Sequence, residues 1–202
     1  MLIGRRSRWH RGFSLIELMI TVAILAILIV LVAPAIGDWL LNAQIRTAAE
    51  SIQNGLQKAR TEAVRRNAPA EFVLAANSGW NINLIQGIAH NNFESRVNAE
   101  GSSQVVVTTS PAGTTTVTFD GMGRSWGDPA TGKNLDGANS APGSNQMQKI
   151  CVNLPTSVLP AARSRNLEID VSLSGAVRMC DPQVTDNTDT RYCPGSPTIC
   201  KD

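Results

Sequence analysis

The sequence is poor in the residue types that carry most chemistry. Of its 202 residues, 4% are aromatic and two are histidines, and His90 is the one beyond the N-terminal apolar run. The chain contains no nucleophile elbow, P-loop, dinucleotide-binding glycine pattern or H-E-x-x-H metal motif. We therefore expect no enzyme activity, no cofactor and no metal site. We also expect His90, in the stretch GIAHNNF, to lie in a loop.

A basic excess is also missing from most of the chain. The formal net charge is +2, but Arg5, Arg6, Arg8 and Arg11 all precede the apolar run. Without the first twelve residues, 14 Lys and Arg remain against the same 16 Asp and Glu, which is a net charge of −2. This balance excludes a large, non-specific nucleic-acid surface, although it leaves room for a small basic patch.

The cysteines lack the C-x-x-C spacing of a zinc or redox site. All of them lie late in the chain, at Cys151, Cys180, Cys193 and Cys200. An even number in a loop-rich region predicts two disulfides and an oxidising compartment. Four cysteines allow three pairings. The polar stretch that begins at Cys180 and ends at Cys193 favours a bridge across it, which leaves Cys151 with Cys200.

A single long apolar run, from Phe13 to Ala33, stands at the N-terminus. As a helix its residues span about 31 Å, enough for a bilayer core. The preceding arginines should stay cytoplasmic, which places the remainder, cysteines included, on the far side. A cleaved secretory signal is the alternative. Such a signal has a shorter core and a small-residue site after it, and none precedes Pro34.

Glu17 is the one charge within this run, and it lies in a motif. The residues Gly12-Phe13-Ser14-Leu15-Ile16-Glu17 resemble the prepilin peptidase site of type IV pilins and type II secretion pseudopilins. The resemblance implies cleavage after Gly12 by a prepilin peptidase and N-methylation of Phe13. It also makes Glu17 the fifth residue of the mature chain.

A charge in a membrane-length segment is costly unless it has a partner. We expect the Glu17 carboxylate to pair with the α-amino group of a neighbouring subunit's Phe13, which also sets the register between subunits. The alternative is that Glu17 reaches water at the membrane edge. Pro34 predicts a helix kink, either as an adjustable point in a filament or as a plain membrane exit.

The pattern beyond Pro34 predicts a continuing amphipathic helix. Apolar residues recur at steps of three and four, and Asn67-Ala68-Pro69 should stop the helix after Arg66. The apolar positions are Leu41, Ile45, Ala48, Ala49, Ile52, Leu56, Ala59, Ala63 and Val64. The expected organisation is a leader (1–12), a transmembrane or filament-core helix (13–33), an amphipathic helix (34–66) and a β-rich periplasmic domain (67–202).

Short β-rich runs separated by Gly and Pro follow the helix. We expect strands at 71–76, 80–85, 104–109, 114–120, 149–154 and 167–173, with a seventh at 177–180, and a long polar loop over 125–148. The predicted fold class is α+β. A long N-terminal helix, half transmembrane and half amphipathic, packs on an antiparallel, pilin-like β head whose C-terminal region is held by disulfides.

Three stretches of the head resemble the GspH/FimT-like group of minor pilins and pseudopilins. They are LQKARTEAVRRNAPAEFVL (56–74), FDGMGR (119–124) and SGAVRMC (174–180). DNA-uptake members carry the last as G-R-x-R, but here Ala176 replaces the first arginine and only Arg178 matches the second. The candidate DNA contacts are Arg163, Arg165, Arg178 and Arg191.

The leading functional hypothesis is a minor pilin of a type IV pilus that primes or caps assembly at the tip. The resemblance implies a single-pass bacterial inner-membrane protein with a periplasmic head that later enters a pilus or pseudopilus filament. Its partners would be other pilins, met through the N-terminal helix, the prepilin peptidase and a minor pilin tip complex. The alternatives are a DNA-binding minor pilin for natural transformation and a minor pseudopilin of a type II secretion system.

Overall fold

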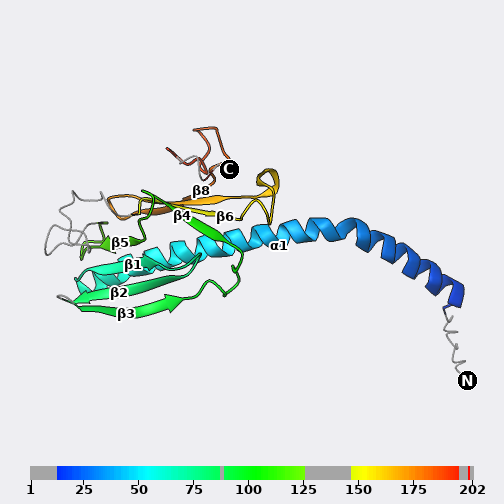
Figure 1. The fold of residues 1–202 in the computed structure, drawn as a ribbon, viewed down its shortest axis with the longest axis horizontal. Coiled ribbons are helices and arrows are strands. Elements are labelled where there is room, and N and C mark those ends of the chain that lie inside the picture. The colour runs from blue at the N-terminus through cyan, green and yellow to red at the C-terminus, as the bar shows by residue number, and fades with distance from the viewer. Residues whose placement is uncertain (1–12, 87–88, 126–146, 196–199, 201–202) are drawn as a thin grey trace, which may run out of the picture. The chain divides into compact units, whose positions relative to one another are not determined.

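The computed structural model describes residues 13–86, 89–125, 147–195 and 200, and the side chains of all of these except residues 32–35. The chain forms two compact units, Met1–Gly37 and Asp38–Asp202, the second of which is called the head below. The elements are labelled in Figure 1. In chain order they are α1 (Leu15–Arg66), β1 (Ala70–Leu74), β2 (Trp80–Gln86), β3 (Ala89–Arg96), β4 (Val106–Ser110), β5 (Thr116–Phe119), β6 (Lys149–Asn153), the 3-10 helix η1 (Ala161–Arg163), β7 (Leu167–Val171) and β8 (Val177–Cys180).

The part of α1 in the first unit is apolar on every side. From Phe13 to Leu31 each described large hydrophobic side chain is more than half exposed. Within the described residues no single helix meets the length and hydropathy of a membrane span. Taken together, the two segments Leu15–Leu31 and Ile36–Arg66, which are separated by a break, do meet these criteria of length and composition.

The part of α1 in the head buries one stripe of small and aliphatic side chains. Seven of the predicted positions are fully buried and Leu41 packs against them: Ile45, Ala48, Ala49, Ile52, Leu56, Ala59 and Ala63. The prediction for Val64 is wrong, because Val64 is 50% exposed while its neighbour Ala63 faces the core. The whole core cluster comes from residues after Asp38, so the head has a hydrophobic core of its own.

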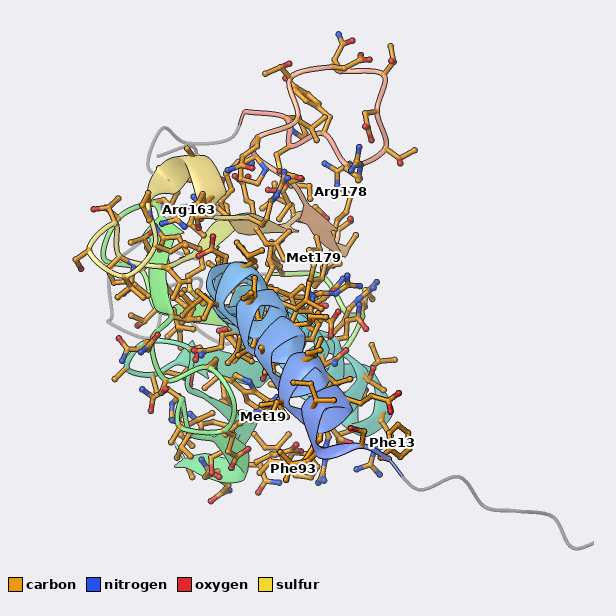
Figure 2. All side chains as sticks on the ribbon, turned by 90° about the vertical axis from the view of Figure 1, so that its right-hand side faces the viewer. Phe13, Met19, Phe93, Arg163, Arg178 and Met179 are labelled. Carbon is orange, nitrogen blue, oxygen red and sulfur yellow. A yellow bond between two sulfur atoms is a disulfide. The ribbon has the colours of Figure 1, made fainter. Side chains whose placement is uncertain are left out.

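Two antiparallel sheets of four strands enclose this helical stripe. Their strand orders are β3-β2-β1-β5 and β4-β6-β7-β8. Figures 1 and 2 show the first sheet below the head part of α1 and strands of the second above it. Alternating residues such as Phe72, Ile82, Ile150 and Ile169 point inward and complete the core. The predicted α+β fold with an antiparallel β head is confirmed, as are all seven predicted strands to within two residues at each end.

Strand β3 was not expected, and the prediction that His90 lies in a loop is wrong. His90 pairs with Ile85 on β2. Most residues of β3 are exposed, so the strand has no apolar alternation that a sequence pattern could reveal. Its place at the sheet edge comes from main-chain pairing and from Phe93, whose ring lies 5.9 Å from the Lys58 ammonium and 5.4 Å from the Arg66 guanidinium carbon.

The end of α1 fixes where the first sheet begins. Asn67 adopts a positive φ of 48°, and the N–H groups of Asn67 and Ala68 bond back to Val64 and Ala63. These two bonds form the Schellman arrangement that ends helices at an Asn or Gly. The predicted stop after Arg66 is thereby confirmed, and β1 starts four residues later.

Gly55 sets how closely the helix approaches the first sheet. A Cβ built at this position would lie 2.8 Å from a ring atom of Phe72 and 3.0 Å from one of Trp80. The Trp80 indole N–H donates to the hydroxyl of Ser51 at 2.9 Å, and Ser51 lies one turn before Gly55 on α1. The glycine therefore makes room for two large rings, and the bond to Ser51 orients one of them.

Candidate functional site

The exposed apolar helix of the first unit is the most unusual surface of the chain. A soluble monomer rarely presents a contiguous apolar area of this extent to water. Two kinds of environment could cover it, a lipid bilayer or other helices of the same kind. The first unit is therefore a candidate site of membrane insertion and assembly.

Glu17 lies in the first turn of α1, where a negative charge is favoured by the helix dipole. Among the described residues it forms no ion pair. Phe13, two residues before the helix, is 82% exposed. Gly12 lies outside the described residues, and Pro34 is one of the four positions whose side chains are not described. The cleavage site, the methylation site, the charge pair and the kink therefore stay predictions.

Two of the family-like stretches of the head meet at one point on α1. Gly123, in FDGMGR, accepts a hydrogen bond from the Arg60 Nε at 2.8 Å. Gly175, in SGAVRMC, packs directly on Gly123, since a Cβ built on Gly175 would lie 1.9 Å from the Gly123 oxygen. Both glycines have φ near +77°. The contact joins the loop after β5 to the β7–β8 turn, and it explains why glycine occurs in both stretches.

Asp120 organises the loop that holds Gly123. Its carboxylate accepts the backbone N–H groups of Met122 at 2.9 Å and Arg124 at 2.8 Å, and it pairs with the Arg124 guanidinium at 2.8 Å. Burial alone raises the pKa of Asp120, but these hydrogen bonds and the nearby positive charge outweigh burial and leave the pKa below its usual range. The ionised carboxylate therefore stabilises the folded loop.

The four candidate DNA-binding arginines do not form a free basic cluster. Arg163 pairs with Asp38 at 2.8 Å, Arg178 lies 3.5 Å from Asp170, and Arg191 pairs with Asp189 at 2.8 Å. In Figure 2, Arg163 and Arg178 lie apart, on η1 and β8. Arg165 is the candidate for which the described residues provide no ion pair. Neutralised cations bind phosphate weakly, so this surface gives little support to DNA binding.

The cysteines join the C-terminal segment to the outer face of the second sheet. Cys180 bonds Cys193 with Cα atoms 5.4 Å apart, and Cys151 bonds Cys200 with Cα atoms 5.5 Å apart. This is the pairing that the sequence favoured. Cys151, Glu168 and Cys180 stand side by side on β6, β7 and β8. The described residues after β8, 181–195 and 200, therefore lie against the face of the sheet that points away from α1.

A buried ionic cluster beneath this covering segment was missed by the sequence reasoning. The Lys149 ammonium donates to Glu168 at 2.7 Å, Asp170 at 2.8 Å and the Pro194 carbonyl at 2.9 Å. Burial lowers the pKa of Lys149, but the two carboxylates outweigh burial and raise the pKa above its usual value. The alternation in KICVN and LEIDV could have revealed the cluster, because it puts these side chains on one face.

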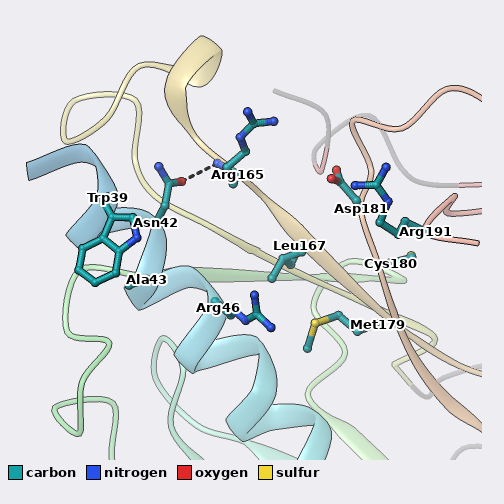
Figure 3. A pocket seen from close by; sticks show the side chains of 10 residues that line it. All are labelled: Trp39, Asn42, Ala43, Arg46, Arg165, Leu167, Met179, Cys180, Asp181 and Arg191. Carbon is teal, nitrogen blue, oxygen red and sulfur yellow. Dashed lines mark hydrogen bonds between the residues drawn. The ribbon is translucent and has the colours of Figure 1, made fainter. Parts of the chain in front are cut away.

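The head also contains a groove of about 570 Å³ between α1 and strands β7 and β8 (Figure 3). Its lining is apolar around Trp39, Ala43, Leu167 and Met179. The remaining lining residues are Asn42, Arg46, Arg165, Cys180, Asp181 and Arg191. Trp39 is 70% exposed. Nothing in the sequence indicates this groove, because its walls come from two segments, residues 39–46 and 165–191, that are far apart in the chain.

An apolar N-terminal helix that continues into an antiparallel β head defines a pilin-like protein. Residues 10–33 match the model of the prokaryotic N-terminal methylation motif. Residues 48–175 match the family model described as type II transport protein GspH, which covers more than half of the chain. The chain belongs to this GspH family. Its family and fold are those of structural pilins.

The structure is similar to two crystal structures of the type IV minor pilin FimU from Pseudomonas aeruginosa strain PAO1. One matches with 15% identity and a TM-score of 0.46 and covers 70% of this chain and 94% of that chain. The other matches with 15% identity and a TM-score of 0.43 and covers 68% and 97%. No curated protein sequence matches the chain.

Proposed function

We propose that this chain is a minor subunit of a type IV pilus whose helix enters the filament core and whose head primes or caps assembly at the tip. The single observation that carries the proposal is the first unit of the chain. It is an apolar helix exposed on all sides that contains one carboxylate, at Glu17. Membership of the GspH family supports the coarser role of a pilin-like filament subunit.

Charge pairing at the mature N-terminus gives the Glu17 carboxylate a role in assembly. Cleavage after Gly12 exposes the α-amino group of Phe13, four residues before Glu17, and this amine stays positively charged after the separate N-methylation step. In a bundle of such helices, the amino group of one subunit and the Glu17 carboxylate of the next can pair in a medium of low dielectric. Removing one partner of a buried ion pair costs about 3–5 kcal/mol, because the other charge is left without compensation.

The head has the features of a domain that folds independently of the N-terminal helix. It forms its own core and is closed by two disulfides, so it can fold before the helix leaves the membrane. Placement at the tip rests on the family resemblance to minor pilins.

The test is Glu17→Ala compared with Glu17→Asp in the full-length chain. We expect both variants to insert into the membrane and both to be cleaved. Glu17→Ala should be missing from sheared filaments, whereas Glu17→Asp should be partly retained. Normal entry of Glu17→Ala into filaments would overturn the charge-pair mechanism.

The description of the family model favours a second candidate, a minor pseudopilin of a type II secretion system. Deletion of the gene separates the two. Loss of surface pili with intact protein secretion supports the pilus subunit. The reverse outcome, loss of secretion with normal pili, supports the pseudopilin.

A further inference from the structure

The groove between α1 and strands β7 and β8 has a lining that filament entry of the N-terminal helix does not explain. Apolar side chains line it from both walls. They are Trp39 and Ala43 on α1, and Leu167 and Met179 on β7 and β8 (Figure 3). Trp39 is 70% exposed, which is unusual for so large an apolar surface. A ligand with an apolar part is needed to cover it.

Three arginines and one carboxylate line the groove, and the carboxylate, Asp181, accepts the Gln183 backbone N–H at 2.9 Å. Arg46 pairs with Glu50 at 2.7 Å, and Arg191 pairs with Asp189 at 2.8 Å. Arg165 has no carboxylate partner among the described residues. Its backbone N–H donates to the Asn42 side-chain oxygen at 2.7 Å. This bond holds the backbone of Arg165, just before β7, against α1.

One unpaired guanidinium beside an apolar surface matches a ligand with one phosphodiester and an apolar body. The planar fork of an arginine binds two phosphate oxygens at once, and a phosphodiester carries a single negative charge. DNA fits this groove less well. It offers a row of phosphates, and the neighbouring cations that could meet them are already neutralised.

The position of the groove along the chain indicates the source of such a ligand. Trp39 follows Ala33, the last residue of the apolar run, by six residues. Six residues reach at most about 20 Å even when fully extended. Tryptophan is enriched where membrane proteins meet the headgroup layer, because its ring is apolar with a polar edge. The groove wall is therefore tethered close to lipid headgroups whenever the run lies in a membrane.

We propose that this groove binds a membrane glycerophospholipid, with the phosphodiester on Arg165 and the glycerol and first acyl carbons against Trp39 and Leu167. The site would hold the head of the subunit at the membrane surface before filament assembly. The inference rests on the membrane stage of the proposed function, but it does not depend on the Glu17 charge pair.

The test uses the full-length chain in bacterial membranes, with the photoreactive residue p-benzoylphenylalanine in place of Ala43. After irradiation, the membrane fraction is purified and its intact mass is measured. We expect an adduct with the mass of one phospholipid. The same replacement at Thr61, an exposed residue of α1 outside the groove, should give none.

Two arginine variants decide whether the adduct reports a site. Arg165→Ala should lower the adduct at least about tenfold, because the charge-assisted hydrogen bonds to both phosphate oxygens are lost. Arg46→Ala is the matched control, because this arginine also lines the groove but already has a carboxylate partner; it should leave the yield unchanged.

Three results would overturn the proposal. They are a lipid adduct that does not respond to Arg165→Ala, the absence of an adduct, and an adduct with the mass of another subunit. The last would assign the groove to contacts between subunits and leave the proposed function intact. Filament entry of Arg165→Ala, measured in parallel, should be normal. A failure of Glu17 variants alone would therefore concern assembly and not the lipid site.

Discussion

The first part of α1 is aliphatic along almost all of its length and the second has one aliphatic stripe, and the two parts also differ in what these side chains contact. From Leu15 to Leu31 the large apolar side chains are all exposed, whereas from Ile45 to Ala63 the apolar stripe is fully buried by two sheets. The second part therefore contributes to the stability of the head. Among its described residues, the first part buries no large hydrophobic side chain, so these side chains are available for lipid or for other subunits.

The largest expected effect comes from the same truncation made in each part. Leu56→Ala removes a fully buried side chain and should destabilise the head by about 2–5 kcal/mol. Leu25→Ala removes a side chain that is 56% exposed and should leave the head unchanged. Urea unfolding of the full chain in detergent, followed by the fluorescence of buried Trp80, measures both. Equal losses would mean that the two parts are not independent.

The next effect concerns the disulfide that closes the segment after β8. Cys180→Ser together with Cys193→Ser opens a loop with a sequence separation of 13 and should cost the head about 3 kcal/mol. The helical circular dichroism of the first unit should persist, because no cysteine lies there. Cys180→Ser alone also opens this bridge and should cost about as much, which shows that the loss comes from the bridge and not from the second replacement. An unchanged unfolding midpoint in the double variant would show that the bridge does not hold this segment in solution.

A smaller effect should appear at low pH through Asp120. Its pKa is lower in the folded head than in the unfolded chain, so the carboxylate adds stability above the unfolded pKa of about 3.9. That contribution is lost as the pH falls through the folded value. Asp120→Asn should therefore be less stable than the natural head at pH 7, and the difference between the two unfolding curves should shrink as the pH falls below the unfolded pKa of about 3.9. A constant difference across the pH series would contradict this account.

The smallest expected effect is on DNA. Arg178 already contacts Asp170 and donates to the Tyr192 carbonyl at 2.9 Å. A gel-shift salt series with the natural chain and with Arg178→Ala should give no band at physiological salt and no difference between the two proteins. A band that disappears with Arg178→Ala would instead favour a DNA-binding minor pilin and would add a function to the head.

Sequence patterns predicted best those elements whose burial repeats regularly. The helical stripe around Ile52 and the strands with alternating apolar residues were found because burial imposes a period of three to four or of two. Strand β3 was missed because it is exposed at a sheet edge and has no such period. Val64 was misassigned because two adjacent apolar residues near a helix end fit the period about equally well.

The candidate sites divide in the same way. The leader motif and Glu17 are local in sequence, so the sequence alone marked them. The partners of the arginines could not be predicted, because Asp38 lies 125 residues from Arg163 and only folding brings them together. The same holds for the contact of Gly123 with Gly175.

The sequence by itself determined the apolar run with its single carboxylate, the end of α1 after Arg66 and the α+β class of the head, because these follow from local composition and periodicity. The sequence also favoured the cysteine pairing that the structure has, whereas tertiary structure alone decided which arginines pair with carboxylates and where a groove forms. Those outcomes depend on distances between segments remote in the chain, and such distances are set by the packing of two sheets on one helix.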